Sequence, residues 1–121
     1  MDLTQRTATD LRDAIAGGEL TAAELTQAYL ERIEACDAAL HAYHAVHRER
    51  ALERAKQVDA GQIAGPLAGV PIALKDVLCT SYGQTTCSSR MLEGYESPFT
   101  ATAVDKLEAA GAIVLGKTNM D

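Results

Sequence analysis

Aromatic residues are scarce in this sequence, which has no tryptophan and only 4% Phe and Tyr among its 121 residues. Proteins that bind single-stranded nucleic acid stack its bases on aromatic side chains, so a base-stacking platform is not expected. Positive charge is also limited, because 17 acidic residues against 11 Lys and Arg give a net charge of −6. Phosphate backbones are bound mainly by Lys and Arg. We therefore do not expect this segment to hold a nucleic acid by itself.

The sequence also lacks long hydrophobic runs and paired cysteines. No apolar run approaches the roughly 20 residues of a membrane span, and residues 1–6 lack the apolar core of a signal peptide. Cys36, Cys79 and Cys87 are an odd number with no CxxC spacing, a usage typical of a reducing compartment with buried or idle thiols. We expect a cytoplasmic protein that makes no contact with a membrane.

Three histidines recur at a spacing of three, at His41, His44 and His47. A metal site on a helix would need further ligands, and no carboxylate or cysteine completes the set. We therefore expect residues 41–47 to be a short extended connector, with the histidines at the surface or hydrogen-bonded. No metal site and no cofactor site are expected in this chain.

The first half of the chain has the patterns of helices. An apolar stripe predicts a helix over residues 9–16, which the glycines after it should end. Thr21 and Glu24 have the spacing of a capping box and predict the start of a second helix, residues 22–36. A third helix is predicted over residues 48–59.

The second half has the pattern of a βαβ unit. Apolar runs at residues 70–74 and 112–115 predict two buried strands, the first buried on both faces. Between them lie an irregular region, with a helical turn near residues 90–92, and a helix that starts near Thr100 or Thr102. Strands joined by such a crossover are parallel. The predicted fold class is therefore α/β, with a sheet that two strands leave incomplete.

Composition changes near Gly61, from Ala, Glu and Arg to β-branched residues, Gly, Ser and Thr. We place a boundary there. Residues 1–61 are predicted to be a helical segment, and residues 62–121 are predicted to be the start of an α/β core.

Lys75 and Asp76 follow the first strand without a spacer. In open α/β sheets, ligands bind at the carboxyl ends of the strands. A lysine partly withdrawn from water becomes less basic, because burial disfavours its charged form, and it can then accept a proton. The alternative is an ordinary strand-end lysine whose stem covers apolar surface while its head stays in solvent.

Two other motifs are better explained by structure than by chemistry. Residues 111–118 match the G-x-x-x-x-G-K-[ST] phosphate-loop pattern, but a helix is predicted before Gly111 and the four middle residues are apolar. We interpret them as a helix end, a strand and a turn, because a phosphate loop needs a preceding strand and a flexible backbone cradle. Cys87 would need a histidine beside it to be a nucleophile, and no pattern places one there.

Residues 65–76, GPLAGVPIALKD, resemble the amidase signature family. Within that family, the sequence resembles the A subunits of aspartyl/glutamyl-tRNA amidotransferases, and the likeness covers nearly the whole chain. The stretches that carry it are residues 11–33, 85–93, 101–104 and 111–121. Residues 81–84 depart from the usual pattern, and Val77 stands where a polar residue is common.

The resemblance implies a chemistry for Lys75. Enzymes of this family use a Ser–cis-Ser–Lys triad, and the lysine of the G-V-P-I-A-x-K-D block is its base. That lysine corresponds to Lys75, which would stay neutral and activate the nucleophilic serine through the bridging serine. The family's Gly/Ser-rich stretch, with both serines, lies beyond position 121, and the serines at 81, 88, 89 and 97 do not correspond to them.

The resemblance also implies partners. In the complex, the A subunit hydrolyses glutamine and passes the ammonia to a partner subunit, which amidates Glu or Asp misacylated on tRNA. The B and C subunits are the implied partners, and the partner subunit uses the ATP and Mg. An acidic A-subunit segment agrees with this division of labour.

Two alternatives stay open at this point. The chain could belong to a stand-alone amidase, for which no partner subunit would be needed. It could also be a non-catalytic fragment, without glutaminase turnover by itself, whose strands at residues 70–74 and 113–115 would lie uncovered and promote association.

Overall fold

The structure is a computed structural model and describes residues 2–120. The three helices predicted for the first half are present, with a 3₁₀ turn η1 (Leu3–Gln5) before them. The capping box is confirmed, since the Thr21 hydroxyl accepts from the Glu24 N–H and the Glu24 carboxylate accepts from the Thr21 N–H. The second helix is longer than predicted and ends at His41 in a left-handed conformation, with φ of 52°. The helices are α1 (Ala8–Ala16), α2 (Ala22–Leu40) and α3 (Arg48–Asp59).

The described residues form one three-stranded sheet with the order β1-β3-β2. Its strands are β1 (Tyr43–Val46), β2 (Pro71–Lys75) and β3 (Ile113–Thr118). β2 and β3 are parallel and are joined through α4 (Thr102–Ala109), so the predicted βαβ unit and the α/β class are confirmed. The 3₁₀ turn η2 (Arg90–Leu92) also lies where a helical turn was predicted.

Two expectations about the strands were wrong: residues 113–115 are not uncovered, and the first strand is not buried on both faces. The connector at residues 41–47 is extended, as predicted, but it also joins the sheet as β1, antiparallel to β3. This makes β3 the central strand, and Ile113–Leu115 are buried rather than uncovered. β2 lies at an edge of the sheet and is not buried on both faces, because Ala73 is exposed while Leu74 is buried.

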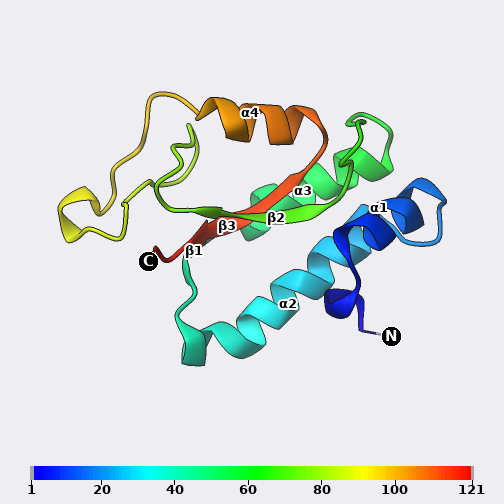
Figure 1. Cartoon of the computed structure of the whole chain (residues 1–121), viewed down its shortest axis with the longest axis horizontal. Coiled ribbons are helices and arrows are strands. Elements are labelled where there is room, and N and C mark those ends of the chain that lie inside the picture. Colours follow the sequence, from blue (N-terminus) through cyan, green and yellow to red (C-terminus); the bar gives the residue numbers. More distant parts are fainter. Residues whose placement is uncertain (1, 121) are drawn as a thin grey trace.

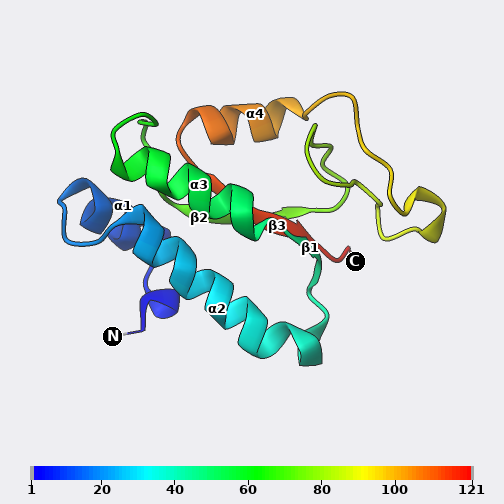
Figure 2. The same cartoon turned by 180° about the vertical axis from the view of Figure 1, so that it is seen from behind.

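Helices cover both faces of the sheet, with α4 on one side and α2 and α3 on the other (Figures 1 and 2). One face of β3 packs on α2 and α3 in a cluster of buried residues: Ala22, Leu30, Ala51, Ala55, Ile113 and Leu115. The other face meets α4 in a smaller cluster: Leu74, Val104 and Val114. Both β1 and the larger cluster therefore join residues on either side of position 61, where the domain boundary stays a prediction.

The segment between β2 and α4 extends beyond the carboxyl ends of β2 and β3 (Figure 1). It is irregular apart from η2, as predicted. This places the segment and the end of β3 around Lys75. Within residues 2–120, no helix has the length and apolar character needed to cross a membrane.

Candidate active site

Lys75 is the last residue of β2, at the carboxyl edge of the sheet. Its side chain is exposed among the described residues, which agrees with the alternative of an ordinary strand-end lysine rather than with a lysine withdrawn from water. The reason is that β2 is an edge strand whose alternate residues face outward. The Lys75 Nζ donates to the main-chain oxygen of Asn119, just past the end of β3, at 3.2 Å.

Asp76 is the next residue, and it is fully buried. Its Oδ2 accepts hydrogen bonds from the Thr86 N–H, at 3.2 Å, and from the Thr86 hydroxyl. Its main-chain oxygen accepts from the N–H of Cys87 at 3.1 Å. Asp76 therefore fastens the loop at residues 85–88 to the end of β2.

A second lysine, Lys117, is buried in β3 with a relative exposure of 0%. Its Nζ lies 3.7 Å from Asp76 Oδ1. Burial lowers the pKa of Lys117, while the neighbouring carboxylate of Asp76 acts to raise it. The buried lysine near this edge is thus Lys117 rather than Lys75.

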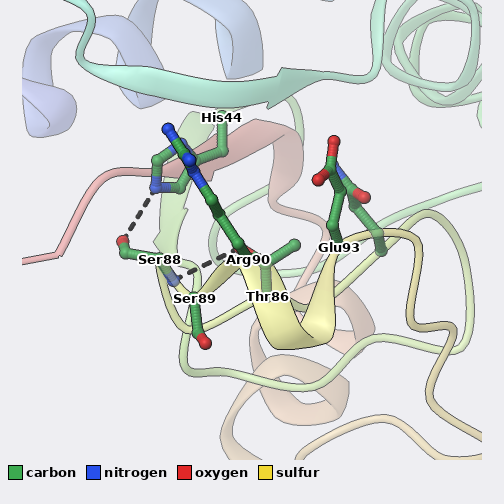
Figure 3. Close-up of a pocket in the computed structure, with 7 residues that line it drawn as sticks. His44, Thr86, Ser88, Ser89, Arg90 and Glu93 are labelled. Atoms are coloured by element: carbon green, nitrogen blue, oxygen red, sulfur yellow. Dashed lines mark hydrogen bonds between the residues drawn. The ribbon is translucent and has the colours of Figure 1, made fainter.

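The loop at residues 85–88 is held in an uncommon conformation. Cys87 and Ser88 both have positive φ, 53° and 58°, a region that residues other than glycine rarely adopt. The turn brings the Ser88 hydroxyl within 2.8 Å of His44 Nε2, from β1 (Figure 3). The same hydroxyl donates to Asn119 Oδ1 at 3.1 Å. A histidine therefore reaches the residue after Cys87, which no sequence pattern indicated.

An open pocket of about 390 Å³ lies beside this turn (Figure 3). Its lining is mostly polar: His44, Gln84, Thr86, Ser88, Ser89, Arg90 and Glu93. No group of three His, Cys, Asp or Glu side chains in the described range is arranged to hold a metal ion. The arrangement offers hydroxyl, imidazole, guanidinium and carboxylate groups for hydrogen bonding and proton transfer.

Sequence reasoning missed Lys117, His44 and Asn119 as parts of this site. Lys117 was assigned to a turn, but β3 continues through Thr118. Had the predicted strand been extended past Gly116, Lys117 would have been placed beside the end of β2. His44 had no local signal, because its place depends on β1 joining the sheet.

The chain matches the Amidase family over residues 24–121. It is 53% identical to the A subunit of a glutamyl-tRNA(Gln) amidotransferase from Nocardia farcinica, over 99% of this chain and 26% of that protein. The protein of the same name from Moorella thermoacetica is 50% identical, over 100% of this chain and 26% of that protein.

Among solved structures, the native peptide amidase from Stenotrophomonas maltophilia matches with a TM-score of 0.83 and 37% identity. The match covers 96% of this chain and 25% of that one. The chain thus spans about a quarter of the length of the curated relatives it matches. The resemblance first noted in residues 65–76 is confirmed, and the chain belongs to the amidase family.

Proposed function

We propose that this chain is part of the glutamine-hydrolysing A subunit of a tRNA-dependent amidotransferase. The observation that carries the proposal is the identity of about half of all residues, over 99% of the chain, to proteins named as A subunits of glutamyl-tRNA(Gln) amidotransferase. The solved peptide amidase is less similar, at 37% identity. The names of these relatives favour Glu-tRNA(Gln) over Asp-tRNA(Asn) as the final acceptor.

In this proposal Lys75 is the general base of a Ser–cis-Ser–Lys triad. The Nζ would take the proton of the nucleophilic serine through the bridging serine, so that the serine oxygen can attack the glutamine amide. Two features support the role. The Lys75 side chain is accessible at the sheet edge where ligands of α/β proteins bind. In addition, the Lys75 Nζ lies 3.2 Å from the main-chain oxygen of Asn119, so the amine sits where the ends of β2 and β3 meet.

The remaining parts of the reaction belong to the complex. The B and C subunits are the proposed partners, and glutamine is the proposed substrate of the A subunit. The ammonia released would amidate Glu on misacylated tRNA, with ATP and Mg consumed at the partner subunit. The net charge of −6 agrees with tRNA contacts that lie mainly on the partners.

The test is Lys75→Ala in the full-length protein assembled with its partner subunits. We expect glutamine hydrolysis to fall about 10²–10⁴-fold, the usual contribution of general acid–base catalysis. Lys56→Ala, which removes an exposed lysine of α3, is the matched control and should keep wild-type turnover. Turnover in Lys75→Ala equal to that of the control would refute the assignment.

A stand-alone amidase is the second candidate, favoured by the match to the peptide amidase. The two differ in what they need. An A subunit should amidate Glu-tRNA only with its partner subunits and ATP, whereas a stand-alone amidase should hydrolyse small amides at full rate without them. Assaying the full-length protein with and without the partners separates the two candidates.

A further inference from the structure

Lys117 is a buried ammonium group whose hydrogen-bonding capacity is fully used. Its Nζ donates to the main-chain oxygens of Leu78, at 2.8 Å, and Gln84, at 3.2 Å, and to the Thr85 hydroxyl at 3.0 Å. A lysine ammonium has three N–H donors, and three acceptors surround this one. Lys117 thereby ties two separate parts of the irregular segment to the central strand.

Asp76 completes this buried group. Its Oδ1 lies 3.7 Å from the Lys117 Nζ, and both side chains have a relative exposure of 0%. Oδ1 has no hydrogen-bond partner among the described residues, so the charge of Lys117 is its main compensation. Buried ion pairs often contribute little to stability, because removing two charges from water costs about as much as their attraction returns. The presence of this buried pair is therefore better explained by the segment that it holds in place than by a gain in stability.

What it holds is the turn that carries Ser88. The Thr86 hydroxyl donates to Asp76 Oδ2 and accepts from the Ser88 N–H, at 3.2 Å. The N–H of Cys87 donates to the main-chain oxygen of Asp76. These bonds offset the cost of the left-handed conformation of Cys87 and Ser88, which persists only where surrounding structure imposes it.

Hydrogen bonds link this turn to Lys75. The Ser88 hydroxyl is bonded to His44 and to the side chain of Asn119, and the main-chain oxygen of Asn119 accepts from the Lys75 Nζ (Figure 3 draws the contact between Ser88 and His44). The buried pair and the exposed lysine thus belong to one continuous set of contacts across the ends of β2 and β3.

We propose that Lys117 and Asp76 are positioning residues of the active site. They fix the turn at residues 86–88 against β3, so that Ser88 and Asn119 are preorganised beside Lys75. This inference rests on the proposed function, because Lys75 must be the base for its surroundings to matter to turnover. Neither residue is expected to contact substrate.

The test uses the full-length protein with its partner subunits and measures kcat and KM for glutamine. In Lys117→Met, we expect kcat to fall roughly 10–100-fold, the usual effect of losing a supporting contact, with a smaller change in KM. The double variant Lys117→Met/Asp76→Asn should recover part of the lost kcat, because no uncompensated charge then stays buried. Lys106→Met, which removes an exposed lysine of α4, is the control and should match the wild type.

Three outcomes would overturn the proposal. The first is a folded Lys117→Met with wild-type kcat, and the second is a double variant whose kcat is no higher than that of the single one. If Lys117→Met does not fold, Thr86→Val decides, since it removes the hydroxyl between Asp76 and Ser88 and keeps both charges. A wild-type kcat in Thr86→Val is the third outcome.

The failure of this inference can be told apart from failure of the proposed function. Lys75→Ala is assayed in the same preparation. If Lys75→Ala stays active, the proposed function itself is wrong. If Lys75→Ala is inactive while Lys117→Met is fully active, Lys75 keeps its role and the positioning role of Lys117 is refuted.

Discussion

His47 is a half-buried histidine whose protonation the fold opposes. Its Nε2 has no hydrogen-bond partner within residues 2–120, and its ring meets that of Tyr82 edge-on, with centroids 5.5 Å apart. Burial is the main cause that lowers the pKa of His47. The positive charges of Lys117 and Arg50 lower it further, and Asp76 acts in the opposite direction. The folded protein therefore keeps His47 neutral at a pH where an exposed histidine takes up a proton.

This predicts a loss of stability in mild acid. Above the ordinary pKa of about 6.5, His47 is neutral in the folded and the unfolded chain and contributes no pH dependence. As the pH falls below that value, the unfolded chain binds a proton that the folded one does not. The free energy of unfolding should then fall by up to about 1.4 kcal/mol per pH unit, until the pH reaches the lowered pKa of the folded state.

Denaturant titrations of the wild type and of His47→Gln between about pH 8 and about pH 5 measure this effect. The variant should lose less stability over that range. His41→Asn removes an exposed histidine at the left-handed end of α2, where asparagine is tolerated, and should keep the slope of the wild type. Equal slopes for His47→Gln and the wild type would contradict the prediction.

At the scale of elements, the pairing of β1 with β3 depends on Gly116. Gly116 lies opposite Val46 of β1 and Ala73 of β2. A Cβ at this position would overlap the main-chain oxygen of Ala45 and would lie 3.0 Å from the Cα of Val46. The antiparallel strand can approach β3 this closely because position 116 carries no side chain.

Gly116→Ala should therefore lower the free energy of unfolding by about 1–3 kcal/mol, the usual cost of overpacking a buried site. Equilibrium denaturation measures it. Gly17→Ala is the matched control, since its φ is −82° and the nearest atom to its added Cβ, the main-chain oxygen of Asp13, is 3.2 Å away. The control should change stability by less than about 0.5 kcal/mol. A similar small change in Gly116→Ala would show that β1 can shift at no cost.

What the sequence could predict follows from how local each signal is. The bounds of α3 and the capping box of α2 are set by residues within a few positions of one another, and both form as predicted. β1 was missed as a strand of the sheet because its partners, residues 116–118, lie about seventy positions further along the chain. No pattern within residues 41–47 could reveal that pairing.

The same reason explains why Lys117 is buried and Lys75 is exposed. In the parallel register, Leu74 pairs with Lys117 and Lys75 pairs with Thr118. Paired residues of neighbouring strands point to the same face, so Lys117 shares the buried side of Leu74 while Lys75 takes the other. Sequence patterns located the edge where these groups meet, but only the register decides which lysine is buried.

In the molecule as a whole, the two faces of the sheet are held unequally. Within residues 2–120, the cluster on the α2–α3 face has six buried residues, and the cluster on the α4 face has three. A polar contact supplements the smaller side. Glu108 of α4 accepts hydrogen bonds from the Tyr82 hydroxyl, at 2.6 Å, and from Arg50 of α3, at 3.0 Å. This contact joins helices that cover opposite faces of the sheet.

We therefore expect amide hydrogens of α4 to exchange faster than those of α2, because opening α4 exposes less apolar surface. Glu108→Gln keeps the shape of the side chain but removes its charge, which should cost roughly 1–3 kcal/mol as bonds to a charged group are lost. Hydrogen–deuterium exchange should then accelerate in α4 more than in α2.

Glu34→Gln is the matched control, because it breaks an exposed ion pair of the same kind, between Glu34 and Arg48 at 3.0 Å. Exposed pairs contribute about 0–1 kcal/mol, so exchange in α4 should not change. If Glu108→Gln accelerates exchange in α2 and α4 equally, the chain opens as one unit and the contact does not hold α4 separately. If exchange in α4 is unchanged, the apolar contacts of Val104 are enough to hold α4 on the sheet.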